Sequence, residues 1–251
     1  MNVTIRPKDI LEHIVTHTLG TAIEDELGSG YYGDAFLLED GNVAKLTRSM
    51  TEGIYAARLL GQSHPNLVNI HSVHCLDYAD SKQFLIVQEF VNTDHPLVEE
   101  ANNSMDLIME RGHSIYEYFD FNDLDTDEQE ILQSHGFQKS LVEDVQDGLY
   151  FHQAMGNLAT DANPSNIGVK TVGDRITIAL FDQMNQALER SISKVDFRLE
   201  DYLQEDVLAK INHISIADVR ASITNAAYME EYDNEKVNAQ VEALWQTNHI
   251  P

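Results

Sequence analysis

The sequence contains a single cysteine and no long hydrophobic run. Cys75 alone cannot form an intramolecular disulfide, and one thiol in 251 residues fits a reducing compartment. No segment approaches the roughly 18 consecutive apolar residues of a membrane-spanning helix. The N-terminal segment carries Arg6, Lys8, Asp9 and Glu12 without an apolar stretch, which is unlike a signal peptide. We therefore expect a cytoplasmic protein with no membrane partner.

Basic residues are scarce. The chain has 16 Lys and Arg residues against 42 Asp and Glu residues, which gives a formal net charge of −26. A field of this sign repels the phosphates of nucleic acids, so no direct nucleic-acid binding is expected. It does not exclude a local site for a small anion. Three explanations of the charge stay open: solubility in a salty or crowded cell, a basic protein partner, or mimicry of a polyanion.

The order of the hydrophobic patterns predicts an α+β protein with two unequal lobes. We assign residues 1–91 to an N-terminal lobe with a five-stranded sheet and one helix, and residues 92–251 to a reduced, mainly helical C-terminal lobe. An acidic insertion occupies residues 94–135 of the second lobe. The predicted strands are 21–26, 35–38, 43–46, 67–76, 84–91, 167–169 and 176–181, and the predicted helices are 51–60, a short helix from 125 towards 133, 138–155, 201–212, 216–229 and 235–246.

Three glycines between two predicted strands have the spacing G-x-G-x-x-G. They are Gly28, Gly30 and Gly33, in the segment LGSGYYG. Glycines let a backbone turn tightly and approach phosphate oxygens with free N–H groups. In a dinucleotide-binding fold the third glycine opens a helix. Here an apolar strand and the hairpin turn Asp40-Gly41 follow, so the context is strand–loop–strand.

A lysine lies in the next apolar strand. Lys45 ends the run Val43-Ala44-Lys45, and an ammonium group there is costly to bury unless it meets an anion. A nucleotide phosphate and a helix carboxylate would both serve, and the following predicted helix offers Glu52. The alternative is a strand lysine whose ammonium reaches solvent, because Lys stems often lie on apolar surfaces.

Two later segments carry candidate catalytic and metal-binding residues. Asp161 and Asn166 have the spacing D-x-x-x-x-N, and Asp182 follows an apolar strand. An aspartate can orient an attacking hydroxyl group, and carboxylate and amide oxygens are suitable ligands for Mg²⁺. Taken alone, the first segment is equally well explained as a turn rich in Asp and Asn, and Asp182 as an exposed acid in the turn that ends its strand.

Taken together and in this order, the segments from Leu27 to Asp182 resemble the protein-kinase-like superfamily, which also includes the aminoglycoside and other small-molecule phosphotransferases. The resemblance is interrupted by the acidic insertion. It implies a bilobal kinase-like fold with ATP and Mg²⁺ as cofactors. By this resemblance, Gly28, Ser29, Gly30 and Gly33 would cover the triphosphate, and Lys45 would hold its α- and β-phosphates and pair with Glu52. Gln88 would be the gatekeeper, and Glu89, Phe90 and Val91 would form the hinge that binds adenine through backbone groups. Asp161 would be the catalytic base, and Asn166 and Asp182 would hold Mg²⁺.

The chain departs from the kinase pattern at several positions. Ala159 replaces the usual His or Tyr, Asn163 replaces the lysine of Ser/Thr kinases, and Asp182-Gln183-Met184 replaces D-F-G. No A-P-E motif is visible, and Glu52 follows Lys45 at a shorter distance than is usual. These features indicate a compact, atypical member with little activation segment, so regulation by phosphorylation of that segment is not expected. Small divergent kinases of phages have this form, which suggests a phage or mobile-element origin.

Three functions are compatible with these features. The first is an atypical protein kinase that phosphorylates Ser or Thr, with a basic protein substrate suiting the negative charge. The second is a small-molecule kinase of the aminoglycoside-phosphotransferase type, which Asn163 and an acidic lobe favour because the acceptor would be cationic. The third is a catalytically inactive kinase-like protein that binds and inhibits a basic host protein. We expect the first.

The motif H-x-x-H-C at His71, His74 and Cys75 is the remaining candidate for metal binding. A zinc site would need four ligands, and no second cluster is evident. The alternation of polar and apolar residues around the motif favours a strand instead.

Overall fold

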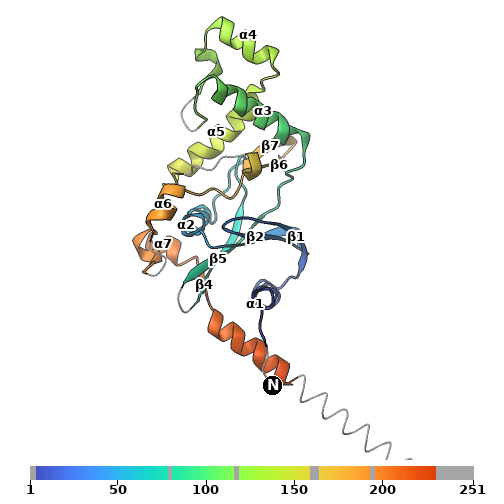
Figure 1. Cartoon of the computed structure of the whole chain (residues 1–251), viewed down its shortest axis with the longest axis vertical. Coiled ribbons are helices and arrows are strands. Elements are labelled where there is room, and N and C mark those ends of the chain that lie inside the picture. Colours follow the sequence, from blue (N-terminus) through green and yellow to red (C-terminus); the bar gives the residue numbers. More distant parts are fainter. Residues whose placement is uncertain (1–3, 79–80, 116–118, 159–163, 193–195, 230–251) are drawn as a thin grey trace, which may run out of the picture.

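The computed structural model describes residues 4–78, 81–115, 119–158, 164–192 and 196–229 (Figure 1). Its architecture is α+β, as predicted, with a strand-rich N-terminal part and a helical part, and it is consistent with a bilobal kinase-like fold. None of the described helices is long and apolar enough to span a membrane.

The strands are β1 (Ile23–Ser29), β2 (Gly33–Leu38), β3 (Asn42–Thr47), β4 (Ile70–Asp77), β5 (Lys82–Glu89), β6 (Ile167–Val172), β7 (Arg175–Leu180) and β8 (Asn212–Ser215). The helices are α1 (Pro7–Ile14), α2 (Met50–Leu59), α3 (Pro96–Glu110), α4 (Thr126–Ser134), α5 (Lys139–Ala154), α6 (Gln186–Ser191) and α7 (Glu205–Leu208), with short helical turns η1 (Val15–Leu19), η2 (Phe121–Asp123), η3 (Pro164–Asn166) and η4 (Leu199–Asp201).

The main sheet has six strands in the order β1-β2-β3-β5-β4-β8. Its first five strands are those predicted from the sequence, and all their pairings are antiparallel. β8 adds a sixth strand, which pairs in parallel with β4 so that His213 lies opposite Cys75. A segment assigned to the C-terminal lobe therefore extends the sheet of the N-terminal lobe.

The predicted helix over residues 201–212 is wrong. The segment forms η4, α7 and then β8. Leu203 and Ile211 are both buried in the main core, which they reach from a turn and a strand start rather than from one helix. Pairing also satisfies the backbone N–H and C=O groups at the open edge of β4, a gain that a surface helix would not provide. The predicted helix over 235–246 lies outside the described residues.

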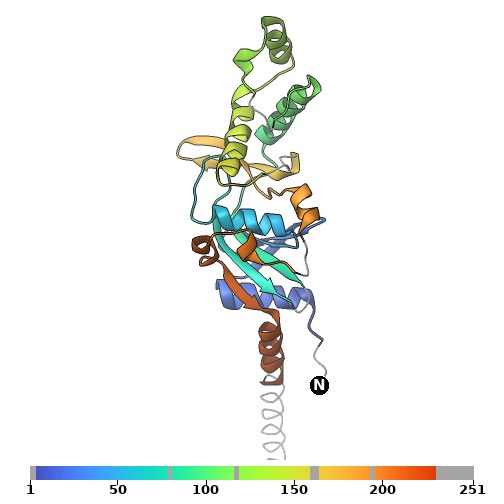
Figure 2. The same ribbon diagram turned by 90° about the vertical axis from the view of Figure 1, so that its left-hand side faces the viewer.

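The sheet buries side chains on both faces because successive residues of β5 point to opposite sides. Phe84 and Ile86 pack in the core that contains α2, whereas Leu85 and Val87 pack in the core that contains α1. Residues 216–229 are helical, as predicted, and their first turn joins the α1 core. The sheet is thus covered by α2 on one face and by α1 and the beginning of the helix over 216–229 on the other, and this helix then runs away from the sheet (Figures 1 and 2).

Helix α2 agrees with its prediction to within one residue at each end. Ser49 caps its N-terminus by accepting a hydrogen bond from the backbone N–H of Glu52 at 3.2 Å. Gly53 lets the helix lie close to the sheet, because a Cβ atom at this position would be 2.2 Å from the Phe84 ring. Every residue of α2 except Arg58 is buried, so its position relative to the sheet is tightly defined.

The acidic insertion forms α3, η2 and α4, which project with one end of α5 away from the sheet (Figures 1 and 2). Asp125 caps α4 as the sequence predicts, accepting from the Glu128 N–H at 2.8 Å. Phe121 stacks on Phe137 with ring centroids 5.3 Å apart, which ties the insertion to the start of α5. Helix α3 has no counterpart among the predicted elements, and neither has α1, which gives residues 1–91 a second helix where the sequence predicted one.

Candidate active site

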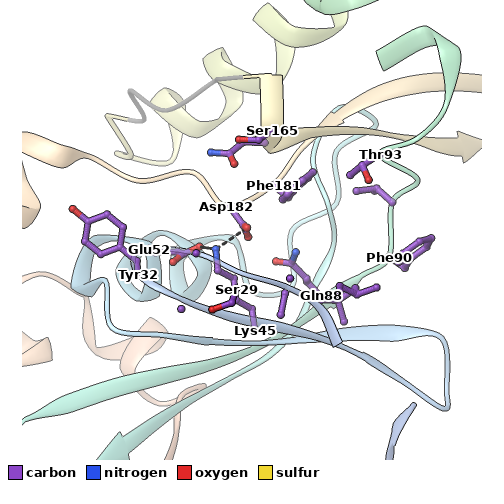
Figure 3. A pocket seen from close by; sticks show the side chains of 18 of the residues that line it. Ser29, Tyr32, Lys45, Glu52, Gln88, Phe90, Thr93, Ser165, Phe181 and Asp182 are labelled. Atoms are coloured by element: carbon purple, nitrogen blue, oxygen red, sulfur yellow. Dashed lines mark hydrogen bonds and ion pairs between the residues drawn. The ribbon is translucent and has the colours of Figure 1, made fainter. Parts of the chain in front are cut away.

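A cavity of about 830 Å³ lies between the main sheet and the β6–β7 hairpin (Figure 3). Its walls come from segments that are far apart in the sequence: the β1–β2 hairpin, β3, α2, the end of β5, η3 and the residues after β7. The lining residues are Leu27, Gly28, Ser29, Gly30, Tyr31, Tyr32, Gly33, Ala35, Val43, Lys45, Glu52, Gln88, Glu89, Phe90, Val91, Asn92, Thr93, Asp94, Ser165, Asn166, Phe181, Asp182 and Met184.

The glycine-rich segment forms the predicted strand–loop–strand hairpin over the cavity. Its turn is closed by a hydrogen bond from the Gly30 N–H to the Gly33 carbonyl at 2.7 Å. Gly33 is required by packing, because a Cβ atom there would lie 2.0 Å from the Leu46 carbonyl oxygen. Gly28 is different: nothing lies within 4 Å of a Cβ built on it. The backbone at position 28 is therefore open on the side where a side chain would stand, and Gly28 lines the cavity.

Lys45 lies between two carboxylates at the back of the cavity (Figure 3). Its ammonium pairs with Glu52 and lies 2.6 Å from Asp182 Oδ2. Glu52 also accepts a hydrogen bond from Thr47 Oγ1 at 2.6 Å. The side chains of Lys45 and Glu52 are only 13% and 6% exposed, so this lysine does not reach solvent as the alternative interpretation of the sequence proposed.

Burial and the neighbouring charges shift the pKa values of Lys45 and Glu52. Burial alone would lower the pKa of the Lys45 ammonium, but the charges of Glu52 and Asp182 outweigh it and raise that pKa. Burial, reinforced by the charge of Asp182, raises the pKa of Glu52 against the opposing effects of Lys45 and Thr47. One ammonium is shared by two carboxylates, so the cluster has one surplus negative charge. A divalent cation bound beside it would reverse that excess.

Asp182 follows β7 with an unusual backbone. Its φ is +55°, and it is the only non-glycine residue with positive φ in the part of the chain that the structure describes. This conformation is uncommon outside glycine and often marks functional positions. The preceding Phe181 N–H donates to the Asn166 carbonyl at 3.0 Å, which holds the two predicted metal ligands on adjacent segments.

The end of β5 forms one side of the cavity, and the side chain of Glu89 holds it in place. Its Oε2 accepts from the Asn69 N–H at 3.1 Å and from Asn69 Nδ2 at 2.9 Å. It also pairs with Lys170, whose ammonium donates to the Leu67 carbonyl at 2.6 Å. The backbone N–H of Glu89 donates to the Asn69 carbonyl at 2.9 Å, which also fixes the end of β5.

The cavity collects every predicted site residue that lies in the described part of the chain. Ten residues of the prediction line it: Gly28, Ser29, Gly30, Gly33, Lys45, Glu52, Glu89, Val91, Asn166 and Asp182. Asp161, and with it Ala159 and Asn163, lies outside the described residues. Thr47 and Lys170 were missed by the sequence analysis. Thr47 could have been predicted as a neighbour of Lys45 in the site, because residues 43, 45 and 47 of one strand share a face.

The H-x-x-H-C motif lies in β4, as predicted. Cys75 comes close to Asp77 and His213, with one ligand atom of each lying within 4.8 Å of the others. However, Lys82 already pairs with Asp77, and burial raises the pKa of the Cys75 thiol to about 11. These two features oppose metal binding by the cluster.

No protein-family model matches the chain, and no curated protein matches it in sequence. Among solved structures, the chain is similar to the kinase domain of PknI from Mycobacterium tuberculosis, with 18% identity and a TM-score of 0.34. The match covers 66% of this chain and 61% of that domain. A TM-score of this size is too low to support a function, so the function must be argued from the cavity.

Proposed function

We propose that the chain is an ATP- and Mg²⁺-dependent phosphotransferase that acts on Ser and Thr hydroxyl groups of proteins. The observation that carries the proposal is the buried cluster in which Lys45 lies between Glu52 and Asp182 beneath a glycine-rich hairpin. Kinases require this lysine–glutamate pair and a metal-binding aspartate at the same time. A purely structural ion pair would not need a second carboxylate or an 830 Å³ cavity in front of it.

The donor atoms suit the proposed cofactors. The Asn166 amide and the Asp182 carboxylate offer the hard oxygen ligands that Mg²⁺ prefers, beside a cluster with surplus negative charge. When bound, Mg²⁺ neutralises negative charge on the phosphates. The Glu89 carbonyl and the Val91 N–H are the backbone groups proposed to bind adenine, and the glycine-rich hairpin would cover the triphosphate.

The proposed reaction depends on positioning and on charge. Lys45, oriented by Glu52, donates hydrogen bonds to the α- and β-phosphates. Asp161 orients the acceptor hydroxyl group and accepts its proton. The acceptor oxygen forms a bond to the γ-phosphorus while the bond from that phosphorus to the bridging β-phosphate oxygen breaks, and ADP leaves.

The acceptor class is the least constrained part of the proposal. Asp94, an exposed residue in the cavity lining, favours a cationic acceptor. A basic Ser- or Thr-containing peptide and an aminoglycoside both meet that description. Phosphate transfer from ATP to a panel of each, measured in parallel, separates a protein kinase from a small-molecule kinase. Transfer to neither, with nucleotide binding retained, would support the inactive kinase-like alternative.

Nucleotide binding is the first test. ATP at 100 times its Kd should stabilise the protein by about 2.7 kcal/mol, which is a rise in Tm of roughly 5 to 10 °C for a chain of this size. We expect the rise to require Mg²⁺ and to disappear in Lys45→Met and Asp182→Asn. Lys82→Met is the matched control, because Lys82 also pairs with an aspartate but lies outside the cavity lining. Equal shifts in all four proteins, or none in the wild type, would refute the proposal.

A further inference from the structure

Helix α2 is held at its N-terminus by a carboxylate from the other part of the chain. Glu189 belongs to α6, the short helix that follows Asp182. A single oxygen of its side chain, Oε2, accepts hydrogen bonds from Thr51 N–H at 2.9 Å, Thr51 Oγ1 at 3.1 Å and Ser49 Oγ at 3.0 Å. The donors are 138 and 140 residues away in the sequence. This contact is therefore a tertiary tie rather than a local cap.

The contact has the features of a specific anchor. Glu189 is 5% exposed, and a buried carboxylate is tolerated only where hydrogen bonds compensate its lost hydration. Thr51 and Glu52 have two of the free N–H groups of the first turn, and Glu189 and Ser49 accept from one each. A negative charge at this end also interacts favourably with the helix dipole.

The same first turn carries the residue that orients Lys45. Glu52 is the next residue after Thr51, and it reaches back from α2 to the strand lysine. Asp182, seven residues before Glu189 in the chain, contacts the same lysine through its Oδ2 at 2.6 Å. One short segment therefore fixes both partners of the cluster: Asp182 directly, and Glu52 through the N-terminus of its helix.

A further link runs from this segment towards the predicted catalytic loop. Asn185, the N-cap of α6, donates from Nδ2 to the Leu158 carbonyl at 2.9 Å, and its backbone N–H lies 3.4 Å from Thr51 Oγ1. Leu158 is the last described residue before the segment that contains Asp161. α2 and Leu158 are thus both tied to the short stretch around α6.

We propose that Glu189 is a positioning residue that keeps α2 where Glu52 orients Lys45, so that the unmodified chain has an assembled nucleotide site. The inference rests on the proposed function. In kinases, placement of the helix that carries this glutamate is often controlled by phosphorylation of the segment after the metal-binding aspartate. A phosphate acts there as an anion that accepts several hydrogen bonds. Glu189 supplies an anion with three such bonds permanently.

The test combines helix exchange with nucleotide binding in wild type, Glu189→Ala and Asp144→Asn. Asp144 is the matched control because it is also a buried carboxylate, 4% exposed, but it holds Arg175 and the Ile178 N–H on the β6–β7 hairpin. Glu189 does not line the cavity, so any effect of its loss on the nucleotide is indirect, and amide exchange over α2 shows whether that effect acts through this helix.

We expect Glu189→Ala to raise the Kd for Mg²⁺·ATP at least tenfold in protein that is folded by circular dichroism, and to speed amide hydrogen exchange over residues 49–59 at least tenfold. Asp144→Asn should change both quantities less than twofold, even where its Tm falls. If Glu189→Ala does not fold, Glu189→Gln replaces it, since the amide oxygen is still an acceptor but the side chain carries no charge. Glu189→Asp keeps the charge and should restore part of the affinity for Mg²⁺·ATP.

Two results would overturn the inference: nucleotide affinity of the Glu189 variant within twofold of wild type, or unchanged exchange over α2. Failure of the proposed function looks different. In that case the wild type itself binds no Mg²⁺·ATP, and no variant at position 189 binds it either. The contact between Glu189 and α2 would then have no role in nucleotide binding.

Discussion

A buried neutral histidine should make the protein less stable in mild acid. His152 lies on α5, 3% exposed, and its Nδ1 accepts a hydrogen bond from Asn157 Nδ2 at 3.3 Å. Burial, with a smaller effect of the nearby His64, lowers the pKa of His152 from 6.5 to about 4. The unfolded chain therefore binds more protons than the folded chain between these two values, and stability must fall as the pH falls through that window.

The magnitude follows from the two pKa values. Between pH 7.5 and pH 5.5 this one group should reduce the free energy of unfolding by about 1.3 kcal/mol. This range stays above the sequence pI of 4.5, where the protein would lose its net charge. Urea unfolding at both pH values measures the loss in wild type and in His152→Gln, and the variant should lose about 1.3 kcal/mol less.

The control for this comparison is His71→Gln, because His71 is an exposed residue of β4. It should follow the wild type at both pH values. Equal pH dependence in wild type and His152→Gln would refute the reasoning, since it would mean that His152 is solvated or already charged in the folded state.

Three further predictions follow from the geometry. Gly33→Ala should lower the free energy of unfolding in urea by about 3 kcal/mol, because its Cβ would overlap the backbone of β3. Gly28→Ala should keep the stability of the wild type and bind Mg²⁺·ATP more weakly. Glu89→Ala should lower the free energy of unfolding more than Lys170→Met, because it leaves a buried ammonium without its carboxylate, and the reverse order would contradict the assignment. The thiol of Cys75, with a pKa of about 11, should react with a disulfide reagent at pH 8 only after the protein is unfolded in denaturant.

Much of the sheet could be predicted because its strands alternate and its turns are short. The helix that carries Glu52 could be predicted because Ile54, Ala57 and Leu60 recur at helical spacing. Helix α3 was also within reach: Val98, Ala101, Met105 and Ile108 are buried at helical spacing. Glu99, Glu100 and Asp106 lie between them, and these charges make the segment resemble a solvated acidic insertion rather than a half-buried helix.

Strand β8 could not be predicted from its own residues. It has four residues, none of them fully buried, and its sequence Asn-His-Ile-Ser has no strong strand signal. It forms because the edge of β4 offers free backbone groups and because Ile211 and Ile216 on either side are buried in the two different cores. One of these two causes, the open edge of β4, lies more than a hundred positions away in the sequence.

The candidate site shows the same division between local and distant causes. Lys45 and Glu52 are seven residues apart, on a strand and the helix that follows it, so their pairing can be inferred from the order of elements. Glu189 meets α2 across 138 residues, and in the sequence it is one of 42 acidic residues with nothing to single it out. A catalytic group must have a particular chemistry, which restricts its residue type and leaves a motif. A group that only holds a helix in place needs an oxygen at the right point in space, and any segment that the fold brings there can supply it. Such residues can therefore be identified only from the tertiary structure.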